Sequence, residues 1–341
     1  MNYSIRELLG TGGSGAVYKI WDYNLERYCA MKQIKGQCKE EAMCLNELDH
    51  SMLPKVICAE YENGNTIIIM EYIEGVTMTQ YLEEKGSLSQ EKAVSYLLSI
   101  LEVLEYLHQQ RPSLVFGDLK TDNIMVKPDG SLKLIDFGTM EISKEYRKRD
   151  EGKRYATRGF ASPEVYDRDQ EIDCRSDIYS AGAVLFFMLT GIDPSKPPFA
   201  IMKITKCNPC LSKKIEKIVE KSTHRDRDER HQTCAELKRE LEGYERSDKK
   251  SKRVMLVTDF SYGCLIVYTI NLIIRGMFYL EKGNFEIALS SLLKGVGLIF
   301  FAVILKKIVQ LGTYNAFPVK TVKSLFLTEK EGCGILDNHY P

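Results

Sequence analysis

The chain lacks an excess of charge of either sign. Its 341 residues include 47 lysines and arginines and 47 aspartates and glutamates, so the formal net charge is zero. A protein that attracts nucleic acid through its overall field needs a surplus of basic side chains. We therefore expect no nucleic-acid partner. Hydrophobic residues make up 44% and charged residues 28% of the chain, which is ordinary for a globular protein with an ample core.

The chain also lacks an apolar leader and a regular cysteine pattern. Residues 1–10 mix polar and apolar side chains, which predicts a first strand rather than a signal peptide. The ten cysteines have no repeating spacing, so we expect free thiols in a reducing compartment. Cys207 and Cys210 have the separation of a metal-binding pair, but a tetrahedral zinc site needs a second pair, and the sequence does not supply one. We interpret them as two small residues in a loop.

The sequence changes character near residue 250. Up to residue 245, apolar stretches alternate with turn signals, as they do in a soluble domain. Residues 246–253 are predicted to be a charged linker, and residues 254–309 are predominantly apolar. The tail, residues 310–341, is polar and carries no recognisable motif.

Two apolar stretches predict a membrane anchor with two spans. Residues 254–274 have about the length that crosses a bilayer, roughly 20 residues, and a second stretch covers residues 287–305. Basic clusters lie outside both stretches, so the positive-inside tendency places both ends in the cytoplasm. Asp259 and Lys294 leave open the alternatives of buried helices in a small soluble domain or of interfacial helices, because an intramembrane charge is costly.

The first 245 residues predict a strand-rich part followed by a helix-rich part. The β-like runs cover residues 16–20, 28–32, 66–70 and 132–135. The helical periods cover residues 90–108, 177–189 and 212–221. This order favours an α+β protein of two lobes, with a small β-rich N-lobe at about residues 1–73 and a larger helical C-lobe at about residues 74–245.

A glycine-rich segment, Gly10-Thr-Gly-Gly-Ser-Gly-Ala-Val17, fits the pattern G-x-G-x-x-G-x-V. Glycines let a strand–turn–strand flap approach phosphates closely and offer backbone N–H groups to them. The segment is not a Walker A loop, because Ala16 stands where that loop has lysine. A dinucleotide-binding fold would have an acidic residue about 20 positions further on. The sequence has Lys32 there instead.

Lys32 is interpreted as the cation that holds the α- and β-phosphates of a nucleotide. Such a lysine needs a carboxylate to fix its position, and Glu41 on the following predicted helix is the candidate. The same segment offers Glu40 and Glu47, which remain alternatives.

Two later segments supply oxygen ligands and a candidate base. In Asp118-Leu-Lys120-Thr-Asp-Asn123, Asp118 can orient or deprotonate a substrate hydroxyl. Lys120 can neutralise charge on a transferring phosphate, and Asn123 can ligate Mg²⁺. Asp136, which begins Asp136-Phe-Gly138 after a predicted strand, adds a carboxylate of the kind that Mg²⁺ prefers.

Taken in order, these segments resemble the eukaryotic-type protein kinase family, in its bacterial Ser/Thr branch. The matching signatures are the glycine loop, Ala30-Met-Lys32, Asp118-Leu-Lys-x-x-Asn123, Asp136-Phe-Gly138 and Ser162-Pro-Glu164. The resemblance covers residues 1–245 and nothing after the charged segment.

The resemblance implies the two-lobed kinase fold and transfer of the γ-phosphate of ATP to protein serine or threonine hydroxyls. Lys120, two residues after Asp118, is similar to the Ser/Thr pattern. The implied cofactors are ATP and Mg²⁺, with Mn²⁺ as a second choice of metal, and the implied metal ligands are Asn123 and Asp136. The implied catalytic residues are Asp118, Lys120 and Asn123. The implied nucleotide-binding residues are Gly10, Thr11, Gly12, Gly13, Ser14, Gly15, Val17, Ala30, Lys32, Glu41, Met70, Glu71, Ile73 and Asp136.

The resemblance also assigns structural roles. Met70 would be the gatekeeper, and residues 71–73 would be the hinge that binds adenine through backbone hydrogen bonds. Glu164 would pair with Arg230. Asp177 would brace the catalytic loop, and Thr157 would contact Asp118 and Lys120.

The sequence departs from the family before the catalytic aspartate. The family usually has His-Arg-Asp, whereas this chain has Phe116-Gly117-Asp118. Phe116 can fill the space of the histidine but cannot form its hydrogen bonds. The missing arginine normally pairs with a phosphorylated residue of the activation loop. We therefore hypothesise that activity does not depend on loop phosphorylation through that arginine.

Three other functions are considered. A pseudokinase scaffold would keep the fold without transferring phosphate, and the Phe-Gly substitution favours it slightly. A small-molecule phosphotransferase of related fold would lack the Ser-Pro-Glu segment that docks a peptide. The apolar region could also sense a signal, through helix packing or a partner membrane protein.

The expected partners are a protein substrate and membrane lipid around residues 254–309, with a homodimer possible. The expected location is the cell membrane, with the kinase domain in the cytoplasm.

Overall fold

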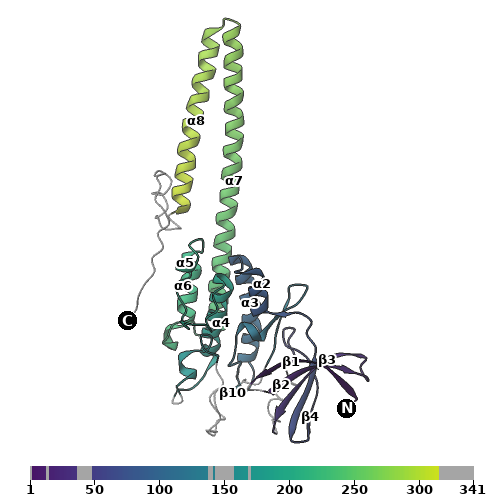
Figure 1. Cartoon of the computed structure of the whole chain (residues 1–341). Helices are drawn as coiled ribbons and strands as arrows, with labels where there is room; N and C mark the ends of the chain where they lie inside the picture. Colours follow the sequence, from purple (N-terminus) through teal and green to yellow (C-terminus); the bar gives the residue numbers. More distant parts are fainter. Residues whose placement is uncertain are drawn as a thin grey trace, which may run out of the picture. The chain divides into compact units, whose positions relative to one another are not determined.

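The computed structural model describes residues 2–12, 15–36, 48–136, 141–142, 157–167 and 170–314 (Figure 1). The chain divides into two compact units, Met1–Glu245 and Arg246–Pro341.

The first unit begins with a five-stranded antiparallel sheet in the order β1-β2-β3-β5-β4. Its strands are β1 Tyr3–Gly12, β2 Gly15–Asp22, β3 Arg27–Lys35, β4 Val56–Glu62 and β5 Asn65–Glu71. The predicted runs at residues 16–20, 28–32 and 66–70 all lie in these strands, so the prediction is confirmed. In this register Val17 is opposite Lys32.

The two faces of this sheet are both covered by apolar side chains. A small cluster contains Cys29 and Met31 of β3 together with Ile20, Ile67 and Ile69. Ile34 and Ile68, at alternate positions of the strands, point to the other face of the sheet and belong to the main core of the unit. Because successive strand residues point to opposite faces, β3 contributes to both clusters. Lys32 lies between Met31 and Ile34 on β3 and is itself buried, so the sheet fixes its position.

The rest of the first unit is mainly helical (Figure 1). Its helices are α2 Met78–Lys85, α3 Gln90–His108, α4 Cys174–Thr190, α5 Ile204–Cys207, α6 Lys213–Ser222 and the start of α7 Cys234–Glu281. Short 3₁₀ turns are η1 Thr121–Asn123, η2 Pro163–Val165 and η3 Arg227–Glu229. Small strands form two further sheets, with β6 Val76–Thr77, β8 Ile124–Val126 and β9 Leu132–Leu134 in one and β7 Leu114–Val115 and β10 Glu141–Ile142 in the other.

Local signals in the sequence explain where these helices begin. Ser89 caps α3, Asp173 caps α4 and Ser212 caps α6, each accepting a hydrogen bond from a backbone N–H of the first turn. Helix α3 has the bounds that its periodicity predicts. The predicted helices at residues 177–189 and 212–221 correspond to α4 and α6.

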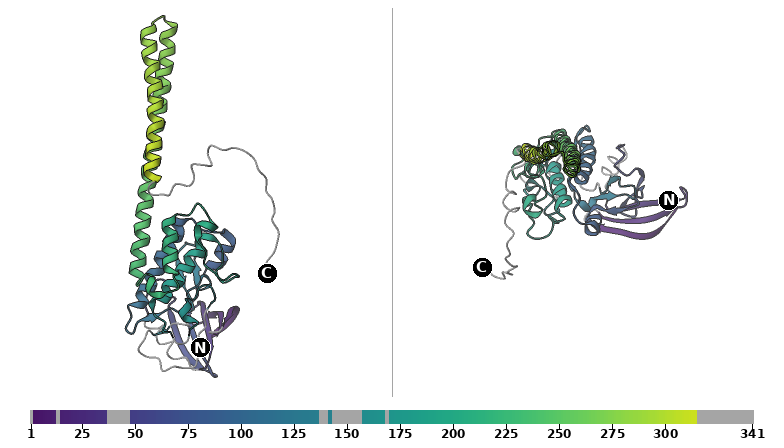
Figure 2. Two further views of the ribbon diagram at one scale, coloured as in Figure 1. Left: turned by 90° about the vertical axis from the view of Figure 1, so that its left-hand side faces the viewer. Right: turned by 90° about the horizontal axis from the view of Figure 1, so that it is seen from above.

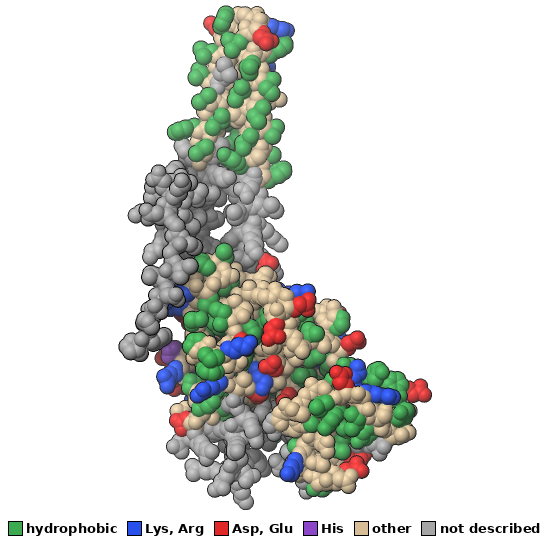
Figure 3. Space-filling view, viewed as in Figure 1, with side chains coloured by type: hydrophobic (Ala, Val, Ile, Leu, Met, Phe, Trp, Pro, Cys, Tyr) green, Lys and Arg blue, Asp and Glu red, His purple; other side chains and the backbone are tan. Residues whose placement is uncertain are grey.

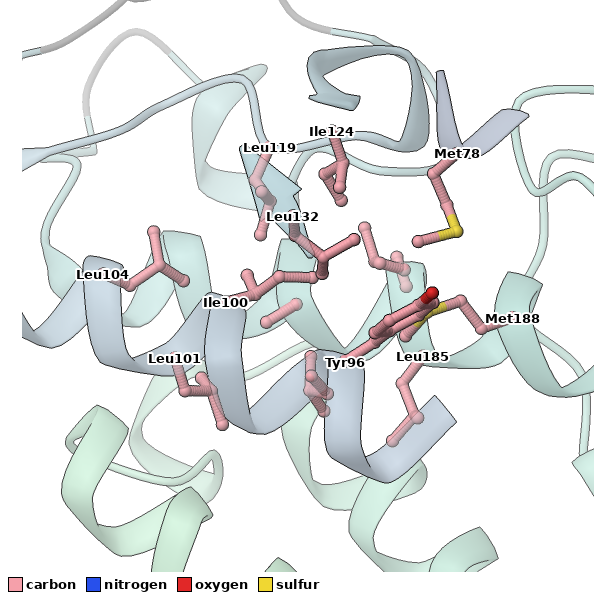
Figure 4. Close-up of a cluster of buried hydrophobic side chains, with 14 of the residues drawn as sticks. Met78, Tyr96, Ile100, Leu101, Leu104, Leu119, Ile124, Leu132, Leu185 and Met188 are labelled. Atoms are coloured by element: carbon pink, nitrogen blue, oxygen red, sulfur yellow. The ribbon is translucent and has the colours of Figure 1, made fainter. Parts of the chain in front are cut away.

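The main core is built around α3 and α4. Figure 4 shows Tyr96, Ile100, Leu101 and Leu104 of α3 in one apolar cluster, which also includes Leu185 of α4. Helix α4 is apolar nearly all round and is buried along most of its length. A helix of this kind belongs in the centre of a domain, and α4 therefore provides a rigid base for the loops that surround it.

The second unit contains the rest of α7 and helix α8 Phe285–Tyr314, which run side by side in both views (Figures 1 and 2). Residues 246–253, predicted as a charged linker, are helical and belong to α7. Lysine, arginine and glutamate are good helix formers, so a charged run of this composition is compatible with a continuous helix.

Among the described side chains of the second unit, the apolar ones are largely exposed. The segment Phe260–Glu281 is long and apolar enough to cross a membrane. It is the one segment of that kind among the described residues. Only 11% of its most apolar 18-residue stretch is buried. Figure 3 shows hydrophobic side chains along the coloured part of the two helices and charged side chains gathered at their turn. On α8, Phe285, Leu293 and Phe300 are each more than 60% exposed.

Candidate active site

The site is centred on Asp118, between β7 and η1. Lys120 Nζ lies 2.7 Å from Asp118 Oδ2. Asn123 donates from Nδ2 to the Asp118 carbonyl oxygen at 2.8 Å and to Oδ2 at 3.3 Å. The turn η1 brings Asn123 back toward Asp118, five residues earlier in the chain. The three residues predicted as catalytic are therefore joined directly to one another.

Thr157, from a segment distant in the sequence, forms hydrogen bonds to both Asp118 and Lys120. Its hydroxyl donates to Asp118 Oδ1 at 2.9 Å and accepts from Lys120 Nζ at 2.9 Å. The contact expected from the family resemblance is thus present. A lysine ammonium between a carboxylate and a hydroxyl is held as a positive charge next to the candidate base.

Asp177 of α4 holds the backbone that precedes Asp118. Its carboxylate accepts from the N–H of Phe116 at 2.8 Å and of Gly117 at 3.0 Å, as well as from His108 Nε2 at 2.8 Å. The expected bracing role of Asp177 is confirmed. Phe116, which stands at the sequence position of the family histidine, is fully buried. Gly117 has φ +82°, a left-handed conformation that glycine adopts without strain.

Lys32 and Asp136 meet across the site. Lys32 Nζ lies 2.9 Å from Asp136 Oδ1, with 4% and 35% of the respective side chains exposed. Asp136 follows β9 and has φ +65°, which is unusual for a residue with a side chain. Strain of this kind persists where surrounding structure imposes it, and it concentrates at functional sites. Glu41, the predicted partner of Lys32, lies outside the described residues.

Asn123 and Asp136 are brought together by the backbone. The N–H of Ile135 donates to the carbonyl oxygen of Asn123 at 2.9 Å, which puts Asp136 next to the catalytic loop. The described residues contain no cluster of three or more His, Cys, Asp or Glu side chains that could hold a metal. Mg²⁺ does not require one, because it keeps waters and phosphate oxygens beside one or two protein ligands. The amide oxygen of Asn123 and the carboxylate of Asp136 fit that requirement.

The glycine-rich segment forms the end of the β1–β2 hairpin. Gly10, Thr11 and Gly12 end β1, and Gly15 begins β2. Gly15 has φ +124°, and a Cβ placed there would lie 2.2 Å from the carbonyl oxygen of Gln33, so this position requires glycine. A Cβ at Gly10 or Gly12 would meet no described atom within 4 Å, which leaves open space above them. The predicted residues Gly13 and Ser14 lie outside the described residues.

The predicted hinge follows directly from β5. Ala30 is paired with Met70, and Ile73 is buried. The N–H of Glu71 donates to the carbonyl oxygen of Lys55 at 2.9 Å. That N–H is therefore occupied, and a bound base would have to use other backbone groups of residues 71–73.

The side chain of Glu71 has an unexpected partner, Lys133 of β9. Lys133 Nζ donates to Glu71 Oε2 at 2.8 Å and to the carbonyl oxygen of Leu53 at 3.2 Å. The N–H of Lys55 also donates to Glu71 Oε2, at 3.3 Å. The sequence gives no local signal for this pair, because its members are 62 residues apart.

Glu164 and Arg230 form a buried ion pair elsewhere in the first unit. Arg230 Nη1 and Nη2 donate to the two carboxylate oxygens of Glu164 at 2.7 and 2.8 Å, with neither side chain more than 2% exposed. Burial by itself raises the pKa of Glu164, but the hydrogen bonds and charge of Arg230 outweigh it and leave the pKa lowered. The pairing expected from the resemblance is confirmed.

Comparison with known proteins agrees with this geometry. The family model for the protein kinase domain matches residues 3–264. A probable serine/threonine-protein kinase of Clostridium acetobutylicum is 28% identical over 278 residues, covering 74% of this chain and 42% of that protein. The serine/threonine-protein kinase PrkC of Bacillus subtilis is 26% identical, covering 70% of this chain and 40% of that protein.

Solved structures give the same fold. The kinase domain of PknI from Mycobacterium tuberculosis superimposes with a TM-score of 0.57 at 18% identity, covering 71% of this chain and 95% of that chain. The chain spans only 38% to 42% of the length of the first four curated relatives. The β-rich and helical parts of the first unit are therefore the two lobes of a kinase fold, and the chain belongs to the protein kinase family.

Proposed function

We propose that the first unit is an active serine/threonine protein kinase that transfers the γ-phosphate of ATP to protein hydroxyls. The main support is that the side chains of Asp118, Lys120 and Thr157 are joined pairwise by hydrogen bonds, and that Lys32 and Asp136 form an ion pair. Each residue type that the chemistry needs is present and in contact with another. The names of the bacterial relatives, which are serine/threonine-protein kinases, support the same activity.

The proposed reaction is an in-line displacement at the γ-phosphorus. The oxygen of the substrate hydroxyl forms a bond to phosphorus, the bond from phosphorus to the bridging oxygen breaks, and ADP leaves with that electron pair. Asp118 orients the hydroxyl and receives its proton. Lys120 offsets the negative charge on the transferring group, and Lys32 holds the α- and β-phosphates. Mg²⁺, or Mn²⁺, would be held by Asn123 and Asp136 and would supply charge neutralisation on the phosphates.

Phosphotransfer from ATP to a generic protein acceptor tests this proposal against the pseudokinase alternative. Asp118→Asn should lower kcat by about 10²- to 10⁴-fold, because it removes the base. The matched control is Asp122→Asn, an exposed aspartate in the same loop, which should retain wild-type activity. If the wild-type and Asp118→Asn proteins transfer phosphate equally, the measured phosphotransfer does not come from this site. The chain would then be a scaffold.

We also infer that activation does not pass through an arginine before Asp118. Gly117 occupies that position and has no side chain to bind a phosphate. Phosphatase-treated protein should therefore keep its activity, as should Thr139→Ala and Ser143→Ala variants, whose positions lie outside the described residues. One phosphosite that switches activity on would contradict this inference. Thr157 is unsuitable for the test because it contacts Asp118.

For the second unit we infer a two-span membrane hairpin built by α7 and α8. Phe260–Glu281 has the length and composition of a span. Helix α8 approaches α7 closely, since a Cβ on Gly295 would lie 3.4 Å from Ile273 and 3.8 Å from Thr269. Small residues at such contacts are typical of helices that associate in membranes. The basic residues before the first stretch and after the second support cytoplasmic ends.

Membrane flotation tests the hairpin. The full chain should float with liposomes and resist extraction at alkaline pH, whereas a chain that lacks residues 254–341 should stay in the soluble fraction. A truncated chain that still floats would contradict the anchor. Labelling of a cysteine placed at Lys282, in the turn before α8, by a membrane-impermeant reagent added outside intact cells would distinguish a hairpin from helices on the inner surface. Homodimer formation stays a prediction.

A further inference from the structure

Three helices of the first unit meet behind the catalytic loop. His108 is the last residue of α3, Asp177 lies in α4, and Cys234 is the first residue of α7. Cys234 Sγ lies 3.5 Å from His108 Nδ1, and His108 Nε2 lies 2.8 Å from Asp177 Oδ2. All three side chains are buried or nearly so. The proposed phosphotransfer uses neither the thiol nor the imidazole.

The donors and acceptors in this group fix where the protons lie. The Asp177 carboxylate accepts from the backbone N–H groups of Phe116 and Gly117, and an ionised carboxylate has no proton to give. His108 must therefore donate from Nε2. A neutral imidazole with its proton on Nε2 has a bare acceptor at Nδ1. The thiol of Cys234 lies 3.5 Å from that atom and can donate to it.

Cys234 is suited to that task because it stays protonated. Burial, with Asp177 nearby, raises the pKa of its thiol well above the ordinary value. A buried thiol of this kind is a weak donor and is not reactive. Its function is therefore to be sought in the contact with His108 rather than in chemistry of its own.

We propose that Cys234 is a positioning residue, whose thiol donates to Nδ1 of His108, holds the imidazole ring in the orientation that donates to Asp177, and so helps to fix the backbone before Asp118. This inference rests on the proposed kinase function. It links the first turn of α7 to the catalytic loop through one thiol, one imidazole and one carboxylate. Without the thiol, the imidazole ring keeps only its contact with Asp177 and can turn away from it. The Phe116–Gly117 backbone is then held less firmly.

Kinetics of the full-length chain test this role. Cys234→Ala removes the donor and should lower kcat by about two- to tenfold, the size expected for one lost hydrogen bond. The KM for ATP should change little, because the nucleotide contacts lie elsewhere. Cys234→Ser keeps a donor and should restore kcat. The matched control is Cys174→Ala, since the Cys174 thiol donates its hydrogen bond to the carbonyl oxygen of Gln232 and not to a member of this chain of bonds.

A double-mutant cycle isolates the coupling. In His108→Gln, the side-chain amide can donate to Asp177 without help from a thiol. Cys234→Ala should therefore have no further effect on kcat in that background. An equal loss in both backgrounds would mean that Cys234 acts through packing alone, and the proposal would be overturned.

The tautomer of His108 can be observed without any activity measurement. In full-length protein labelled with ¹⁵N-histidine, the signal that disappears in His108→Gln belongs to His108, and its shifts report which nitrogen carries the proton. The Nε2–H form in the wild-type chain, with a change in the Nδ1 shift of His108 that reports a lost hydrogen bond in Cys234→Ala, supports the proposal. The Nδ1–H form in the wild-type chain overturns it, even if Cys234→Ala fails to fold. A chain with the expected tautomer but no phosphotransfer would instead contradict the proposed function.

Discussion

Arg230 brings a full positive charge into the interior of the first unit, where its side chain is 0% exposed. Besides Glu164, its guanidinium donates to the backbone carbonyl oxygens of Arg175, His224 and Arg225. Removing one member of a buried, fully hydrogen-bonded pair leaves the other charge without compensation, which costs about 3–5 kcal/mol. Arg230→Met should lower the free energy of unfolding by that amount. The exposed Arg239→Met, on α7, should change it by less than about 0.5 kcal/mol.

The same pair gives a pH dependence with a definite sign. The pKa of Glu164 is lowered in the folded state from its ordinary value of 4.5. Its contribution to stability is therefore fully present above that value and is lost as the pH falls through the folded pKa. Urea unfolding of the wild type and of Glu164→Gln, followed from roughly pH 6 to roughly pH 3, should show the difference between them shrink with falling pH. A constant difference would contradict the assignment.

At the scale of elements, the contact between α4 and α6 depends on a glycine. A Cβ added to Gly182 would lie 2.7 Å from both Ser222 Cβ and Thr223 Cγ2 at the end of α6. Alanine favours a helix over glycine by about 1 kcal/mol, but here the steric conflict should dominate. We expect Gly182→Ala to lower the free energy of unfolding by about 1–3 kcal/mol.

Gly243 on α7 is the matched control for this prediction. A Cβ there would meet no described atom within 4 Å, and the residue is exposed. Gly243→Ala should therefore raise the free energy of unfolding by about 0.5–1 kcal/mol. Thermal unfolding of the two variants beside the wild type measures both changes. Stabilisation by both substitutions would show that α6 can move away from α4 at little cost.

Elements with local signals were predictable from the sequence, and contacts between distant elements were not. Helix α3 has its cap at Ser89 and a clear apolar period, so its bounds followed from local physics. The charged run 246–253 was ambiguous, because the same residues suit a solvated linker and a helix. The order and spacing of the sequence motifs identified Asp118, Asn123 and Asp136 as candidate site residues. The contacts of Lys133 with Glu71 and of Cys234 with His108 join residues 62 and 126 positions apart, and only the folded chain brings these together.

At the scale of the whole molecule, every contact that builds the candidate site joins residues of the first unit. A chain that ends at residue 253 should therefore keep kcat for a soluble substrate within about twofold of the full-length value. A chain that ends at residue 232 should lose activity and stability, because it lacks the fully buried side chains of Leu237 and Leu241 in α7. Comparing the two truncations by phosphotransfer and by thermal unfolding tests this division. Loss of activity in the longer fragment would mean that the apolar helices support catalysis.

Under the proposed function, the contacts of Asp118 also limit how a substrate hydroxyl can approach it. A carboxylate has about four lone-pair positions, two on each oxygen. On Oδ2 both are taken, by Lys120 and Asn123, while on Oδ1 Thr157 takes one. Among the described residues, one acceptor position is left, and it is on Oδ1. In the proposed reaction, an incoming hydroxyl would therefore donate its hydrogen to Oδ1 of Asp118, at the position that Thr157 leaves open.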